Sequence, residues 1–195
     1  MTITDAIKQL KTDTARSTFD QTVELHISLG TDPAKQDQNI RTVISLPHGT
    51  GKEKRVILIN DEAQIAKIVA GELKPKVDFD AVVTTPDFMP KLARAAKILG
   101  PAGMMPNPKT GTVTTDPEKT IAEVKKGQIE LRTEKGARNI HTVIGKLSFD
   151  ETKLADNFKT VIDALNTARP AKLKGKYIKE ITLKSTQSKG LPIDA

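Results

Sequence analysis

The residue types that could do chemistry in this chain are few, and their spacing favours binding over catalysis. The stretch HGTGK, residues 48–52, resembles a phosphate-binding loop, but that motif needs G-x-x-x-x-G-K-[ST] between a strand and a helix. Here a leucine stands five positions before the second glycine, a glutamate follows the lysine, and a strand is expected next. We therefore expect His48, Gly49 and Gly51 to form a hinge between two domains instead of a nucleotide site.

Other catalytic and metal-binding patterns are weak as well. The three histidines, His26, His48 and His141, are far apart in sequence, with no second ligand at metal-site spacing. The absence of cysteine excludes disulfides and thiolate sites and fits a reducing cytosol. A serine–histidine–aspartate triad is not excluded by composition, although no G-x-S-x-G turn is present. We expect neither an enzyme nor a cofactor, metal or small-molecule substrate, and a phosphate-handling enzyme remains the alternative.

A basic segment near the end of the chain points to nucleic acid. Residues 172–189 carry six lysines and one acidic residue, and the whole chain has a formal net charge of +7. A solvated face is the alternative for any such run. The run also includes Ser185 and Thr186, whose hydroxyls suit contacts to sugar and phosphate. With five Phe, one Tyr and no Trp to stack bases on, the expected partner is structured RNA.

Membrane and secretory signals are missing from the sequence. Its start, MTITDAIKQL, lacks a basic stretch followed by an apolar run. No apolar stretch approaches the roughly 20 residues that a membrane-spanning helix needs. The expected location is the cytoplasm, with no membrane partner.

The two ends of the chain have the pattern of an α+β domain with an antiparallel sheet. Apolar and polar side chains alternate cleanly over residues 19–29, which predicts a strand with one exposed face. A helix is expected after a possible capping box from Ser148 to Glu151, and Pro170 ends it. The same strand pattern recurs at residues 41–46, 139–145 and 177–186.

The middle of the chain alternates short apolar strands with helices. Strands are expected at residues 55–60 and 80–85, with a third possible at 111–113. Helices are expected from Asp61 to Gly71, over residues 86–99 and over 116–127. Strand–helix alternation predicts a parallel sheet. The fold class is therefore α/β and α+β in two domains: a split domain of residues 1–50 and 128–195, and an inserted α/β domain of residues 51–127.

The stretch GPAGMMPNPKTGTV, residues 100–113, predicts a loop held in one shape. Glycine allows backbone angles that other residues avoid, and proline fixes φ near −65°. A flexible linker would use glycine and serine without this much proline. The candidate residues of this domain-two loop are Gly100, Pro101, Gly103, Pro106, Asn107 and Lys109.

Several of these stretches resemble successive signatures of the bacterial ribosomal protein L-one family, in that family's order and over nearly the whole chain. The resemblance implies a two-domain protein on the mobile stalk of the large ribosomal subunit, next to the tRNA exit site. It implies binding of large-subunit rRNA, help in releasing deacylated tRNA, and repression of the protein's own operon mRNA. The inserted domain would be Rossmann-like but reduced by one strand–helix unit. The matching stretches are FDQTVELHISLGTDP, QNIRTVISLPHGTGK, DFDAVVTTPDFMP, KILGPAGMMPNPKTGTV, IGKLSFDETKLADN and KGKYIKEITLKST.

The resemblance also assigns RNA-contact positions, all in domain one, the family's main RNA binder. The family's contact cluster falls on Phe19, Thr22 and Thr186. Where the family has Met-Gly after the threonine, this chain has Gln187-Ser188, which changes the conformations open to that turn. The candidate RNA-binding residues are therefore Phe19, Thr22, Lys184, Ser185, Thr186, Gln187 and Ser188.

Overall fold

The computed structural model describes residues 1–14, 18–33, 35, 38–52, 54–108, 111–125, 127–134, 136–171, 173 and 175–194. The chain divides into two compact units. Unit 1 comprises residues 1–51 and 129–195, and unit 2 comprises residues 52–128.

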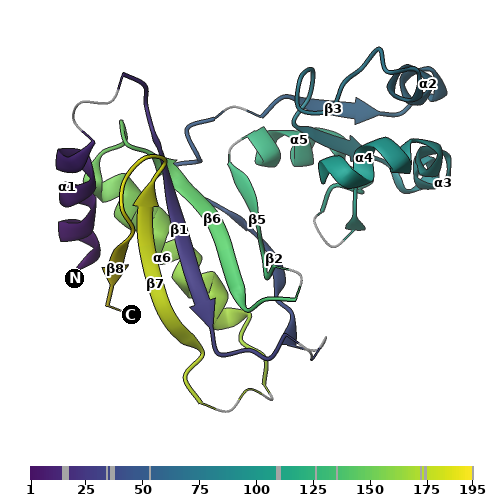
Figure 1. The fold of residues 1–195 in the computed structure, drawn as a ribbon. Helices are drawn as coiled ribbons and strands as arrows, with labels where there is room; N and C mark the ends of the chain where they lie inside the picture. The colour runs from purple at the N-terminus through teal and green to yellow at the C-terminus, as the bar shows by residue number, and fades with distance from the viewer. Residues whose placement is uncertain are drawn as a thin grey trace. The chain divides into compact units, whose positions relative to one another are not determined.

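Unit 1 is built on a four-stranded antiparallel sheet in the order β6-β1-β7-β8 (Figure 1). Every second side chain of β1 is buried, as the alternation predicts, so the sheet has one core face and one polar face. The shortest strand, β8, was not expected from the sequence. The strands are β1 (Thr22–Leu29), β6 (Asn139–Lys146), β7 (Ile178–Ser185) and β8 (Leu191–Ile193).

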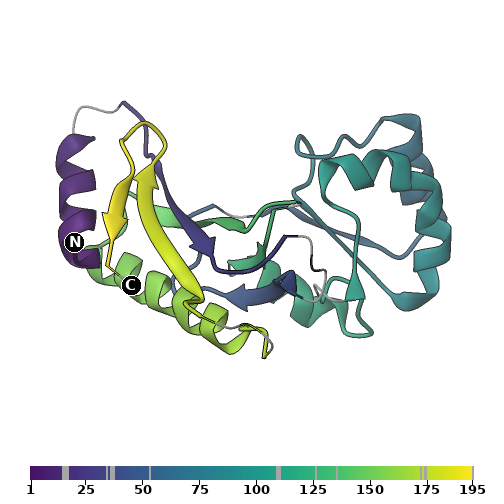
Figure 2. The same cartoon turned by 60° about the horizontal axis from the view of Figure 1, so that its bottom comes forward.

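Two helices, α1 (Ile3–Asp13) and α6 (Glu151–Thr167), cover the core face of this sheet (Figure 2). Their apolar side chains pack against those of β1, β6 and β7 in one cluster. Among the described residues of unit 1, no helix packs on the polar face of the sheet. A separate two-stranded sheet joins β2 (Arg41–Ser45) to β5 (Gln128–Arg132).

The capping box expected at the start of α6 is wrong. The N-cap residue is Asp150, not Ser148. The Ser148 hydroxyl instead donates to Oδ2 of Asp20 at 2.8 Å, and its backbone N–H donates to Oδ1 at 3.1 Å. Ser148 thus bonds Asp20, 128 residues away in sequence, instead of capping the start of α6.

Unit 2 contains the expected parallel strands. β3 (Val56–Ile59) pairs in parallel with β4 (Ala81–Thr84), and α2 (Glu62–Ala70) lies between them in the chain. As expected, α2 ends at Gly71, which adopts the left-handed conformation. The possible third strand is a single parallel bridge from Thr84 to Val113. After it comes α5 (Pro117–Lys125).

The helix expected over residues 86–99 is broken into short pieces. Pro90 lies at the start of α3, where its missing N–H costs nothing, but it could not have continued a helix from residue 86. The last piece extends past residue 99, so Gly100 and Pro101 are helical and the loop begins only after Gly103. The pieces are η2 (Pro86–Phe88), α3 (Met89–Leu92), η3 (Ala93–Ala95) and α4 (Ala96–Ala102).

Each unit has its own hydrophobic core. The core of unit 1 draws on both ends of the chain, from Ala6 to Ile193. That of unit 2 centres on Phe79, which is fully buried among residues of α2, β4 and α4. Among the helices described, none combines the length and apolar character needed to cross a bilayer.

Candidate nucleic-acid interface

The candidate RNA-binding residues gather where β1 begins and β7 ends. We call residues 19–22 and 184–188 the strand-end surface. Thr22 and Thr186 join its two halves by two hydrogen bonds: the Thr186 N–H donates to the Thr22 carbonyl, and the Thr22 N–H donates to Oγ1 of Thr186, both at 3.2 Å. A hydroxyl that accepts such a bond keeps its own proton to donate. Thr186 is exposed, so that proton can be offered to an oxygen in solution.

The buried Gln21 holds the turn after β7 in place through hydrogen bonds, and its role was not predicted from the sequence. Its side chain is only 1% exposed, and Oε1 accepts from the Ser185 hydroxyl at 2.9 Å and from the Gln187 N–H at 3.0 Å. The signal was present in the alternation, because Gln21 continues the inward series of Val23. A polar residue at an inward position needs a buried partner.

The structure separates Ser185 from the other candidates. Its side chain is fully buried and its hydroxyl is committed to Gln21, so it positions the turn and offers nothing to solvent. The turn after it is closed by Ser188, whose hydroxyl accepts from the Ser185 N–H at 2.8 Å and donates to the Lys189 carbonyl at 2.9 Å. The Gln187-Ser188 sequence thus forms an ordered turn without the family's glycine.

Aromatic and basic side chains flank the two threonines. Phe19 is 48% exposed, unusually high for a phenylalanine. Lys184 lies opposite Glu24 on the polar face of the sheet. Lys146, a second residue missed from sequence, donates from Nζ to Oγ1 of Thr22 at 2.9 Å. Two lysines of the basic run, Lys172 and Lys174, lie outside the described residues.

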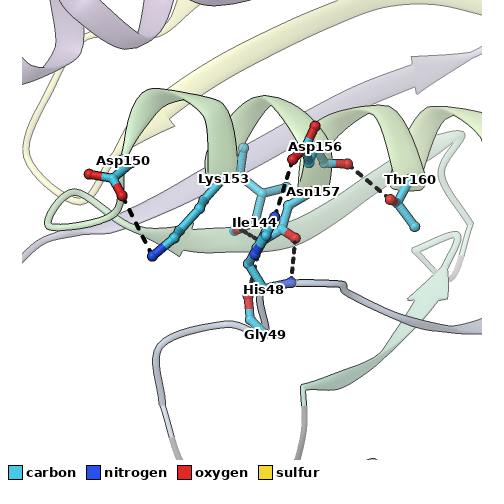
Figure 3. Close-up of polar contacts among 8 residues, drawn as sticks. All are labelled: His48, Gly49, Ile144, Asp150, Lys153, Asp156, Asn157 and Thr160. Atoms are coloured by element: carbon cyan, nitrogen blue, oxygen red, sulfur yellow. Dashed lines mark hydrogen bonds and ion pairs between the residues drawn. The ribbon is translucent and has the colours of Figure 1, made fainter.

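Two of the predicted hinge residues, His48 and Gly49, are held on α6 by one asparagine (Figure 3). Asn157 is fully buried, and its Oδ1 accepts from the His48 N–H at 3.2 Å. Its Nδ2 donates to the Gly49 carbonyl at 3.0 Å and to the Ile144 carbonyl at 2.7 Å. The His48 ring approaches Asp156, with Nε2 and Oδ2 3.2 Å apart. Asn157 therefore holds the backbone just before and just after the His48–Gly49 peptide.

Both hinge glycines adopt angles that favour glycine. The φ of Gly49 is 66° and that of Gly51 is 75°. A Cβ on Gly51 would stand 2.7 Å from Cγ of Lys146 and 3.2 Å from the ring of Phe149. The chain continues from this turn toward β3 and not into a helix, so HGTGK lacks the surroundings of a phosphate loop.

In the proline-rich stretch of unit 2, the side chain of Thr112 bridges the loop by a hydrogen bond to the backbone of Asn107. Oγ1 of Thr112 accepts from the Asn107 N–H at 2.9 Å, and the Thr112 carbonyl accepts from the Thr84 N–H of β4 at 3.0 Å. Pro106 is buried. These contacts tie the loop to the sheet, whereas Gly103 acts as the left-handed cap of α4. Lys109 lies outside the described residues.

Within the described residues, no group of three or more histidine, aspartate or glutamate side chains could hold a metal ion. Two of the histidines do meet, however. His26 and His141 are directly opposite each other on β1 and β6, on the polar face of the sheet.

The sequence matches the Ribosomal protein L1p/L10e family over residues 10–189. It is 46% identical to the large ribosomal subunit protein uL1 of Corynebacterium urealyticum, over 93% of this chain and 81% of that protein. It is 44% identical to the uL1 protein of Streptomyces griseus subsp. griseus, over 96% of this chain and 83% of that protein. It is 46% identical to the uL1 protein of Corynebacterium jeikeium, over 97% of this chain and 85% of that protein.

Proposed function

Because the chain belongs to the Ribosomal protein L1p/L10e family, we propose that it is a structural, non-enzymatic component of the large ribosomal subunit in the cytoplasm. Its role there is to bind large-subunit rRNA at the mobile stalk. The net charge of +7 suits a polyanionic partner. The scarcity of aromatic residues suits a structured RNA over a stacked single strand.

The observation that carries the proposal is the bond from the Thr22 N–H to the Thr186 hydroxyl. It holds the exposed Thr186 oxygen in place and leaves its proton to donate, while Gln21 holds the residues on either side, Ser185 and Gln187. An oriented hydroxyl donates to one RNA oxygen in a defined direction, whereas lysines such as Lys184 supply mainly charge. We assign specificity to Thr186 and sequence-independent affinity to the lysines.

We further propose that unit 1 is the RNA-binding domain and unit 2 the inserted domain. The strand-end surface and its supporting residues all belong to unit 1. A chain that joins residues 1–50 to 128–195 through a short linker should keep most of the rRNA affinity. If this chain folds but binds no rRNA fragment, the contact surface belongs elsewhere.

Placement on the ribosome is tested with the full chain. The protein should co-sediment with large subunits in a gradient of cell lysate. Sedimentation only with free mRNA would instead favour a stand-alone translational repressor. From the family resemblance we also propose transient contact with exit-site tRNA and repression of the protein's own operon mRNA. Adding the protein to a translation extract programmed with that mRNA tests the second role.

The structure moves the proposed hinge further along the chain than the sequence suggested. Since Asn157 holds the backbone of His48 and Gly49, we propose that movement between the units pivots after Gly51, at the boundary of unit 2. Single-molecule distances between labels at Ser28 and Lys125 should then be broad in the free protein. One narrow distribution would contradict movement at any pivot.

A further inference from the structure

The polar face of the main sheet carries a pair of histidines outside the strand-end surface. His26 of β1 and His141 of β6 are directly opposed in the antiparallel register. Their Nδ1 atoms are 2.7 Å apart, and their ring centroids are 4.9 Å apart at an interplanar angle of 62°. The side chains are 30% and 51% exposed, so solutes can reach both rings.

A carboxylate stands at the far side of each ring. Nε2 of His26 is 3.6 Å from Oε2 of Glu24, and Nε2 of His141 is 3.8 Å from Oε2 of Glu134. A neighbouring carboxylate favours a proton on the nitrogen that it faces. At 2.7 Å the two Nδ1 atoms share a hydrogen bond, in which one ring donates its Nδ1 proton to the other. A metal ion bound by both Nδ1 atoms would take the place of that proton.

Glu24 and Glu134 lie on the side of each ring where metal-bound histidines have a carboxylate partner, although 3.6 and 3.8 Å are longer than a hydrogen bond. A ligating imidazole binds through one nitrogen and donates its other N–H to a carboxylate, which fixes the ring and strengthens the ligand.

The surroundings leave room for solvent ligands. A shallow hollow of about 270 Å³ opens at the pair and is also lined by Ser28, Asn139 and Thr182. Tetrahedral zinc with Zn–N bonds of about 2.0–2.1 Å needs its two nitrogens about 3.3 Å apart. The Nδ1 atoms, 2.7 Å apart, would therefore have to separate by about 0.6 Å, which side-chain rotations allow.

We propose that His26 and His141 form a two-histidine site for a divalent transition metal such as Zn²⁺, with water completing the shell. Glu24 and Glu134 favour a proton on the Nε2 atoms, which leaves Nδ1 for the ion, and do not bind the ion themselves. Imidazole ligands favour zinc, copper and nickel over magnesium and calcium. Two protein ligands are fewer than the three or four of catalytic and structural zinc sites, so binding is reversible and weaker. The site does not depend on the proposed ribosomal role.

The test is a zinc titration of the untagged full chain with ¹⁵N-labelled histidines. The ring signals of His26 and His141 should shift together and saturate, and a chelator should reverse the change. Calorimetry should give one zinc per chain. His26→Gln and His141→Gln should each weaken zinc binding by more than about tenfold. Loss of a residue that only hydrogen-bonds to a metal ligand already costs about 10–100-fold in metal affinity.

Two control variants test whether zinc binds at His26 and His141 and not at other surface side chains. His48→Gln removes the third histidine, which lies beside Asp156, and should leave zinc affinity unchanged. Glu134→Gln should weaken zinc binding less than loss of either ring. Circular dichroism of each variant establishes that the sheet is intact. Ring signals of the pair that do not respond to zinc, or a loss in His48→Gln equal to that in His26→Gln, would overturn the proposal.

Discussion

Asn157 offers a sharp test of how the linker is held, because one side chain satisfies three backbone groups. In Asn157→Ala the Ile144 carbonyl loses its side-chain donor in a buried place, which costs about 1–3 kcal/mol. The His48 N–H and the Gly49 carbonyl also lose their partners, but they lie near solvent. Water can replace much of each bond, so each loss is about 0.5–1.5 kcal/mol.

The expected loss is therefore about 2–6 kcal/mol of unfolding free energy, a large share of the roughly 5–15 kcal/mol of a typical domain. Urea denaturation of the full chain measures it in the transition of unit 1. Amide exchange adds a local reading, since the His48 N–H should lose protection while the sheet amides of β1 keep theirs at low denaturant.

Asp156→Ala is the matched control for this experiment. It is the adjacent residue on α6 and removes only the partly exposed contact with the His48 ring. Such a surface pair is worth about 0–1 kcal/mol. If Asn157→Ala cost no more than Asp156→Ala, or if His48 amide protection survived the change, the account of the linker would be refuted.

Two further predictions concern a glycine and the single tyrosine. Gly51→Ala should lower the free energy of unfolding of unit 1, measured in urea, more than Gly136→Ala does. The two glycines have nearly the same φ, 75° and 76°, but a Cβ at Gly51 would lie 2.7 Å from Lys146, whereas nothing lies within 4 Å at Gly136. Equal losses would show that the contact with Lys146 is irrelevant. Burial raises the pKa of Tyr177 to about 12, with Arg169 opposing it, so absorbance of the folded protein should titrate above the usual tyrosine range. Because the folded pKa is raised, this contribution to stability is complete below pH about 10 and is lost as pH rises toward 12; a midpoint near 10 in folded protein would contradict the burial.

The sequence was most informative where structure depends on local pattern. The alternation over residues 19–29 predicted β1 and its two faces, because side-chain direction in a strand follows from position alone. Gly71 likewise marked the end of α2. The parallel pairing of β3 and β4 followed from the alternation of strands and helices.

Features that depend on partners distant in sequence could not be predicted. The capping box failed because Asp20 takes the Ser148 hydroxyl. The meeting of His26 and His141 depends on strand register, which no spacing along the chain reveals. At the candidate interface the threonines were identified by resemblance, but the burial of Ser185 and the role of Gln21 required the fold.

The measurement that tests the central claim most directly compares two variants of β7 on two RNAs. Binding of the full chain is measured on an rRNA stalk fragment and on a non-specific RNA, at several salt concentrations. Thr186→Val removes the oriented hydroxyl and keeps the β-branched shape, whereas Lys184→Ala removes charge. Thr182→Val, on the same strand, controls for loss of a threonine hydroxyl.

Thr186→Val should lose about 1–3 kcal/mol, or about 5- to 150-fold, on the rRNA fragment and little on the non-specific RNA. Lys184→Ala should weaken both to a similar degree and lessen the salt dependence, which for duplex DNA is about −0.9 in the log–log slope per phosphate. Thr182→Val should bind both RNAs like the unmodified chain. Equal losses on the two RNAs for Thr186→Val, with the fold intact, would contradict specific recognition by the strand-end surface.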